Sequence, residues 1–335
     1  VFRVFDALND FNNIEFALKQ VKENGKHAQG AMAYTTSPVH NLETWLDYAK
    51  KVEDSGADSF AIKDMAGILK PYDAFELVTA LKDKLSIPIH MQCHATTGMS
   101  TASNLKAIEA GIDNIDTSIS SMSMTYGHSA TETLVSMFSD READLGLDIN
   151  LLGEISDYFR VIREKYSEFE GSLKGVDSTM LIKQVPGGML SNLESQLKTI
   201  NQQDKLEKVK DEIAKVREDF GYPPLVTPVS QIIGAQSLLN VTENSKYGSL
   251  TSETKKLVLG AYGKLPGKVK EEIVKKASED PPEQEDERKL EEIAEELKTI
   301  CSKNNLPDLS DNTESLLTYT LFSNTAVNFF KERNF

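Results

Sequence analysis

The residues best suited to chemistry stand at the ends of short apolar runs in the first half of the chain. Lys63 closes the run FAIK, where the alternation of side chains along a strand can direct its amine into a protein interior. A buried lysine has several explanations: an ion pair with a neighbouring Asp, a Schiff base, or a carbamate formed with carbon dioxide that can bind a metal. The run itself leaves all of them open.

The run IPIHMQCHATTG places His90, Gln92 and His94 on one face of a strand, because side chains alternate with a period of two. Cys93 faces the other way. His90 and His94 would be about 13 Å apart at about 3.3 Å per residue, too far for both to bind one metal ion at about 2.1 Å. A chelating pair would need positions 92 and 94, and the amide of Gln92 is a poor ligand for a transition metal. This segment allows a metal site but does not require one.

Other polar residues stand at predicted strand ends or helix starts. Arg3 and Asp6 end the first apolar run and are the candidates for binding a substrate. His128 lies in SMTYGHSATE, at the start of a helix for which the sequence predicts a capping box. Thr227 precedes Pro228 at another predicted helix start, where capping alone would account for it.

Five apolar, β-branched runs position these residues, at 2–7, 30–35, 58–64, 87–94 and 113–119. Segments with helical periodicity lie between them. Strict alternation of strand and helix predicts a parallel α/β sheet covered by helices, and no Gly-x-Gly-x-x-Gly follows a strand, which favours a (β/α)8 TIM barrel over a dinucleotide-binding fold. Five units make an incomplete barrel. We therefore expect the N-terminal strands of the barrel, about three βα units, to lie upstream of residue 1.

Helical patterns without strands replace the alternation in the second half of the chain. The sequence therefore predicts a partial TIM barrel of about five βα units over residues 1–145 and an all-α C-terminal region over 146–335. Helices are expected near 148–166, 190–201, 205–219, 228–242, 252–262, 287–303 and 311–333. The acidic, proline-containing segment 278–289 is predicted to be a solvated loop.

Composition narrows the functional class. A formal charge of -15 argues against nonspecific nucleic-acid binding, which depends on clustered Lys and Arg. The chain has no run approaching the roughly 20 apolar residues of a membrane-spanning helix. Its two cysteines are too few for a disulfide framework. We predict a cytoplasmic protein.

Five segments bear a family resemblance when taken in order: VFRVFDALND, AIKDMAGILKP, HATTGMS, QVPGGMLSNL and LVTPVSQIIGAQ. Their order and spacing resemble the biotin-dependent carboxyltransferases, which include the oxaloacetate decarboxylase alpha subunit, the pyruvate carboxylase carboxyltransferase domain and a transcarboxylase subunit. The wording of SMSMTYGHSATETLV is most similar to the decarboxylase alpha subunit. The resemblance implies carboxyl transfer between oxaloacetate and biotin, giving pyruvate and carboxybiotin. A carboxyltransferase of the pyruvate carboxylase B-subunit type is the alternative.

The resemblance also implies roles for particular residues. The family binds a divalent metal, usually zinc, through a carboxylated lysine, a His-x-His pair and an Asp from a strand preceding this chain. Lys63 matches the carboxylated lysine and His94 matches the second His, whereas Gln92 stands at the position of the expected first His. We therefore expect impaired metal binding and activity. Thr227 matches the threonine that passes a proton between biotin and the pyruvate enolate.

The expected partners follow from the same resemblance. The family carries biotin on a Lys between two Met, and none of the nine Met here adjoins a Lys, so the biotin carrier is expected on a C-terminal extension or another chain. The decarboxylase alpha subunit docks on membrane subunits that pump sodium, so any membrane association would be indirect. We expect a homo-oligomer. Two other interpretations remain: a metal-dependent lyase or synthase of the acyl-CoA condensing type, and a noncatalytic assembly subunit, suggested by Gln92.

Overall fold

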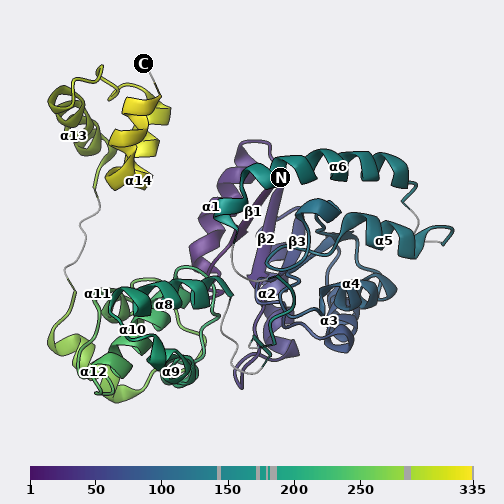
Figure 1. Cartoon of the computed structure of the whole chain (residues 1–335), viewed down its shortest axis with the longest axis horizontal. Coiled ribbons are helices and arrows are strands. Elements are labelled where there is room, and N and C mark those ends of the chain that lie inside the picture. Colours follow the sequence, from purple (N-terminus) through teal and green to yellow (C-terminus); the bar gives the residue numbers. More distant parts are fainter. Residues whose placement is uncertain (142–144, 171–173, 179, 182–186, 283–287, 334–335) are drawn as a thin grey trace. The chain divides into compact units, whose positions relative to one another are not determined.

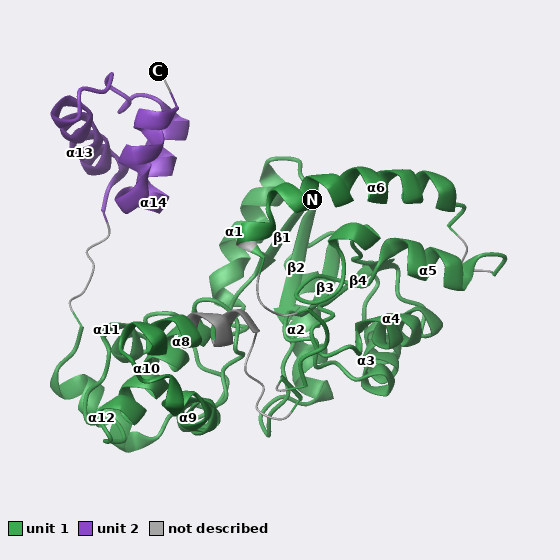
Figure 2. Cartoon of the chain, viewed as in Figure 1, with its two compact units in different colours: residues 1–282 green, residues 283–335 purple. Residues whose placement is uncertain are grey.

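The computed structural model describes residues 1–141, 145–170, 174–178, 180–181, 187–282 and 288–333. The chain forms two compact units, Val1–Pro282 and Glu283–Phe335 (Figure 2). The boundary predicted near residue 145 lies inside the first unit, where strands have given way to helices. As a domain boundary it stays a prediction.

Five parallel strands form the sheet of the first unit and lie in chain order. Figure 1 labels the first three of them. They are β1 Phe2–Phe5, β2 Ala28–Ala33, β3 Ser59–Asp64, β4 Ile89–Cys93 and β5 Asn114–Ile115. The predicted parallel sheet with covering helices is confirmed, and in the described part of the chain it remains open after β5. The last strand is shorter than the run that predicted it, because the chain turns away to pair with a later loop: the backbone N–H of Ser118 donates to the carbonyl of Ser129 (3.1 Å).

The two faces of the sheet differ in polarity, as the period-two alternation of a strand requires. One face is apolar and packs on the helices; its fully buried residues include Ala28, Met32, Phe60, Ile62, Ile89 and Met91. The opposite face carries polar side chains, namely Arg3, Gln29, Ser59, Lys63, His90 and Gln92. The candidate residues of the strands therefore lie on the face that would line the interior of a barrel.

The crossover helices are α1 Asn12–Glu23, α2 Leu42–Asp54, α3 Pro71–Lys84 and α4 Ser100–Glu109. Local signals fix their ends. The side chain of Asn41 accepts a hydrogen bond from the backbone N–H of Thr44 (2.9 Å) at the start of α2, and α3 begins at Pro71, whose fixed φ suits a first helical turn. Gly56 follows α2 with a φ of 86°, a left-handed conformation that glycine adopts without strain because it has no Cβ.

Helices without strands follow in the rest of this unit: α5 Thr131–Phe138, α6 Ile149–Lys165, α8 Gly187–Thr199, α9 Leu206–Asp219, α10 Val229–Thr242, α11 Ser252–Val258 and α12 Glu271–Glu279. The predicted helical region is confirmed, but α12 was missed. Its apolar residues are only Ile273, Val274 and Ala277, of which Ile273 and Ala277 are buried. Three apolar positions among charged residues are too few to stand out as a period. Of the predicted acidic loop, residues 283–287 lie outside the described residues.

A second apolar core holds these helices together. It includes Leu193, Leu197, Val209, Ile213, Phe220, Val229 and Ile233. Leu8, from the segment just after β1, belongs to this core and is 2% exposed. The end of β1 is thereby packed against α8–α10, which places the start of α10 near the sheet.

Polar contacts join the same two regions. The backbone N–H of Lys264 donates to the carboxylate of Asp10 (2.8 Å), and the side-chain amide of Asn13 donates to the carbonyl of Tyr262 (2.9 Å). The guanidinium of Arg217 in α9 donates to the hydroxyl of Thr35 after β2 (2.8 Å). These bonds connect the loops at the carboxyl ends of the strands to the helical region.

The second unit consists of α13 Leu290–Lys303 and α14 Thr313–Glu332 around its own small core. Leu297, Cys301, Tyr319 and Phe330 lie at its centre. None of the helices within the described ranges is long and apolar enough to cross a membrane. Both cysteines, Cys93 and Cys301, are buried and free.

His40 is expected to make stability depend on pH. Burial, together with nearby Arg217, lowers its pKa from 6.5 to about 4. Above pH 6.5 the folded and unfolded chains both hold it neutral. Between pH 6.5 and about pH 4, His40 is protonated in the unfolded chain but stays neutral in the folded chain. The free energy of unfolding should therefore fall by up to about 3 kcal/mol as the pH is lowered through this window.

Urea unfolding at a series of pH values measures this effect. His40→Phe keeps a ring against Trp45, whose centroid lies 5.0 Å from that of His40. It should reduce the pH dependence between 6.5 and 4 and leave the share of His94, whose pKa is also lowered to about 4. An unchanged slope in that variant would assign the dependence to other groups.

Candidate functional site

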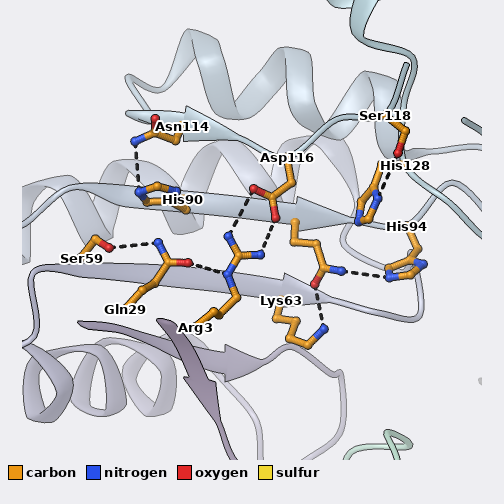
Figure 3. Close-up of polar contacts among 11 residues, drawn as sticks. Arg3, Gln29, Ser59, Lys63, His90, His94, Asn114, Asp116, Ser118 and His128 are labelled. Carbon is orange, nitrogen blue, oxygen red and sulfur yellow. Dashed lines mark hydrogen bonds and ion pairs between the residues drawn. The ribbon is translucent and has the colours of Figure 1, made fainter. Parts of the chain in front are cut away.

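The polar face of the sheet carries two sets of side chains, and hydrogen bonds or ion pairs join the members within each set (Figure 3). In the first, Arg3 of β1 forms an ion pair with Asp116, just after β5, and its Nε donates to Gln29 of β2. Gln29 in turn donates to Ser59 of β3 (2.9 Å). Arg3 was predicted to bind substrate; the structure places it in this network, and the role remains a prediction.

The second set lies at the carboxyl ends of β3 and β4, where (β/α)8 enzymes place their chemistry. Lys63 and Gln92 are opposite each other in the register of the sheet, and the amine of Lys63 donates to Oε1 of Gln92 (3.0 Å). Nε2 of Gln92 lies 3.0 Å from Nε2 of His94, and Nδ1 of His94 lies 2.6 Å from the carbonyl of Tyr126. The three residues singled out in the sequence thus form one hydrogen-bonded chain.

Burial lowers the pKa values of two of these hydrogen-bonded residues, Lys63 and His94. It lowers the pKa of Lys63, with the nearby guanidinium of Arg3 acting in the same direction. It also lowers the pKa of His94 to about 4, so the imidazole of His94 is neutral near pH 7. Lys63 does not form an ion pair with the adjacent Asp64, whose buried carboxylate instead accepts the backbone N–H groups of Ile68 (3.1 Å) and Leu69 (2.8 Å).

His90 and His128 occupy different places. His90 lies beside Asn114, with 3.1 Å between Nε2 and the side-chain amide nitrogen, and Figure 3 shows it apart from His94. His128 lies next to His94, with ring centroids 4.8 Å apart, and its buried Nε2 has no hydrogen-bond partner among the described residues. The capping box predicted after His128 is wrong, because α5 has no side-chain cap and Glu132 instead accepts from a backbone N–H further upstream, at position 120.

Thr227 lies in a small cavity next to this face. The cavity, of about 220 Å³, is lined by residues 5–8 at the end of β1, by residues 227–229 at the start of α10, and by Tyr262. The alternative that Thr227 only caps a helix is not supported, because α10 has no side-chain cap hydrogen bond. Phe5 links the cavity to the other residues: its ring lines the cavity, and the amine of Lys63 lies 4.9 Å from the ring centroid.

Asp6 also lines this cavity, but its carboxylate is engaged by the backbone. It accepts hydrogen bonds from the backbone N–H groups of Leu8 (2.8 Å) and Asp10 (3.0 Å) and from the side chain of Asn13 (3.0 Å). These bonds shape the turn that follows β1. Substrate binding by Asp6 remains a prediction.

The residues of the Lys63 chain do not fit a transition-metal site. The lone pair of Nε2 in His94 points at the amide of Gln92, and the amine of Lys63 donates to the same amide. Zinc is bound by imidazole, thiolate and carboxylate groups. Within the portion of the chain that is described, no three His, Cys, Asp or Glu side chains converge on a point.

Sequence reasoning named the central residues but missed their neighbours. Asp116 and Gln29 hold Arg3, and Phe5 both lines the cavity of Thr227 and lies next to the amine of Lys63. The signal for Asp116 and Gln29 was present, because each is a polar residue at or within an apolar run. For Phe5 there was none, since an aromatic residue in a strand ordinarily packs in a core.

Comparison with protein families divides the chain into two matched regions. Residues 6–159 match the HMGL-like family, and residues 180–335 match a conserved carboxylase domain, PYC_OADA. The pyruvate carboxylase B subunit of Methanocaldococcus jannaschii is 43% identical over 332 residues, which cover 99% of this chain and 59% of that protein. The chain belongs to the biotin-dependent carboxyltransferase family.

Two further relatives support this family membership. The methylmalonyl-CoA carboxyltransferase 5S subunit of Propionibacterium freudenreichii is 42% identical, covering 99% of this chain and 66% of that one. The structure of the carboxyl transferase domain of Rhizobium etli pyruvate carboxylase with pyruvate and biocytin matches with a TM-score of 0.88 at 28% identity, covering 98% of this chain and 58% of that one. The relatives are enzymes, and the chain spans about three fifths of the length of the first of them.

The comparisons favour one of the two predicted activities within this biotin-dependent carboxyltransferase family. The pyruvate carboxylase B subunits of two archaea, Methanocaldococcus jannaschii and Methanothermobacter thermautotrophicus, are 43% and 46% identical to the chain. The predicted alternative, a carboxyltransferase of this B-subunit type, is therefore better supported than the oxaloacetate decarboxylase alpha subunit. Zinc, sodium transport and membrane subunits remain predictions from the resemblance.

Proposed function

We propose that the chain is the carboxyltransferase part of a protein of the pyruvate carboxylase B-subunit type. The observation that carries this proposal is the cavity at the end of β1, in which Thr227 at the start of α10 lies beside Phe5 and Asp6. The amine of Lys63 lies 4.9 Å from the ring centroid of Phe5, which lines the cavity, and supplies a cation nearby. The pyruvate carboxylase relatives indicate pyruvate as one substrate. The family resemblance implies carboxybiotin as the other.

The reaction needs one carboxyl group and one proton to move in opposite directions. The bond between N1 of carboxybiotin and its carboxyl carbon breaks, and a carbon–carbon bond forms at the methyl carbon of pyruvate, giving oxaloacetate. The proton that leaves this methyl carbon passes through the hydroxyl of Thr227 to N1 of biotin. A hydroxyl group can relay the proton because it donates and accepts at once. The hydroxyl of Thr227 forms no hydrogen bond that would compete, as far as the described residues show.

Isotope exchange tests the proposal. The full-length protein that contains this chain, with its biotin carrier or with free biotin, should exchange label between pyruvate and oxaloacetate. The 2-oxoglutarate carboxylase large subunit of Hydrogenobacter thermophilus is 35% identical over 99% of the chain, so 2-oxoglutarate belongs in the assay as a competing substrate. Exchange with pyruvate alone supports the proposal. Exchange only with 2-oxoglutarate, or none with either keto acid, contradicts it, and the second result would favour a noncatalytic assembly subunit.

A further inference from the structure

The link between Lys63, Gln92 and His94 has a fixed hydrogen-bond direction. A lysine amine can only donate, so it must face the carbonyl oxygen of the Gln92 amide (3.0 Å). The NH2 group of the amide must then face Nε2 of His94 (3.0 Å), which accepts. Nδ1 of His94 carries the proton, because it faces the carbonyl of Tyr126 (2.6 Å). In this arrangement every donor among these side-chain atoms faces an acceptor, and every acceptor faces a donor.

A carbamate on Lys63 would break this order. It would leave a single N–H on the nitrogen of Lys63 and add an anionic carboxylate, whose oxygens can only accept and find no donor in the carbonyl oxygen Oε1 of Gln92. Turning the amide round would bring Oε1 to Nε2 of His94; the ring proton of His94 already faces the carbonyl of Tyr126 (2.6 Å), so two acceptors would then face each other. The side chain at position 92 therefore favours an unmodified Lys63.

The charge of Lys63 is also free to act. The amine lies 4.9 Å from the centroid of the Phe5 ring and forms no ion pair in the described part of the chain. Phe5 lines the cavity that holds Thr227. A cation beside a partly buried cavity stabilises negative charge that develops there more strongly than it would in water.

We propose that Gln92 makes this site independent of metal: its amide joins the two side chains that a metal would otherwise bridge, and the unmodified ammonium of Lys63 stabilises the enolate of the keto acid. This inference rests on the proposed function for its substrate. Its structural half, an unmodified lysine and no bound metal, can be tested without measuring activity. The two halves are measured separately.

Metal content and lysine modification test the structural half. The full-length protein, purified with zinc present and no chelator, should hold far less than stoichiometric zinc, and ¹³C-bicarbonate should give no carbamate signal in its NMR spectrum. Gln92→His should bind zinc more tightly by more than the roughly 10–100-fold that an outer-shell partner contributes. Gln92→Leu is the matched control, because it removes the amide without adding a ligand, and should also hold no zinc.

The role of the charge is tested at Lys63 by isotope exchange. Lys63→Met should lose about 10²–10³-fold in rate, the usual cost of removing one group that stabilises an oxyanion. Lys63→Arg keeps a cation that cannot form a carbamate, and should retain part of the rate; a chelator should leave wild-type exchange unchanged.

Stoichiometric zinc in the wild-type protein, with exchange abolished by a chelator, would overturn the proposal. If that zinc were then lost in His128→Ala, the buried Nε2 of His128, which lacks a partner among the described residues, would be identified as the replacement ligand. Equal loss of exchange in Lys63→Arg and Lys63→Met would overturn the role of the charge. Absence of both exchange and metal would contradict the proposed function while leaving the metal-free site intact.

Discussion

Thr227→Ala should lower the rate of exchange between pyruvate and oxaloacetate by about 10²–10⁴-fold, the usual contribution of a group that transfers a proton in the transition state. The side chain lines the cavity beside Phe5 and Asp6 and caps no helix, so its loss removes the proton relay without removing a structural bond. Initial rates of isotope exchange in the full-length protein measure the effect.

Two controls separate the relay from a change in structure. Thr227→Ser keeps the hydroxyl and should retain most of the rate. Because Thr227 is exposed, both variants should change the free energy of unfolding by less than about 0.5 kcal/mol. An alanine variant that exchanges label at the wild-type rate would remove Thr227 from the proposed reaction.

Arg217→Met should lower the free energy of unfolding by at least about 3 kcal/mol, because three described acceptors lose their donor and each buried acceptor left without one costs about 1–3 kcal/mol. Arg217 is 7% exposed and donates to the hydroxyl of Thr35 (2.8 Å) and to the carbonyls of Thr36 (3.1 Å) and Pro223 (3.0 Å). These bonds join α9, the loop after β2 and the segment leading to Thr227. Methionine fills much of the same volume, so the loss reports on the hydrogen bonds more than on packing.

Denaturant unfolding measures this loss. The matched control is Arg160→Met in α6, where the guanidinium is 62% exposed and its ion pair with Asp157 spans 3.8 Å; this change should stay within about 0.5 kcal/mol. Arg217→Met should also slow exchange, since the segment before Thr227 loses one of its anchors. Equal stability of the two variants would show that water replaces the guanidinium at the three acceptors found among the described residues.

The regular alternation of strand and helix was visible in the sequence because it depends on local properties. Apolar runs recurred at the strands, and Pro71 and Gly56 stand at helix ends because of conformational preferences that act within a few residues. Lys63 and His94 stood out because a charged or titratable side chain at the end of an apolar strand is unusual. Dependence on local signals also explains the miss at α12, whose two buried residues are too few to define a period.

The sequence by itself determined the parallel sheet, its covering helices and the identity of Lys63, Gln92, His94 and Thr227 as candidates. Only the tertiary structure decided what these residues contact. Sheet register set Lys63 opposite Gln92, and packing of Leu8 into the helical core brought the end of β1 to Thr227, more than 200 positions away in the chain. The physical reason is that side-chain type and period are local properties, whereas hydrogen-bond partners and cavities depend on which distant segments the fold places side by side.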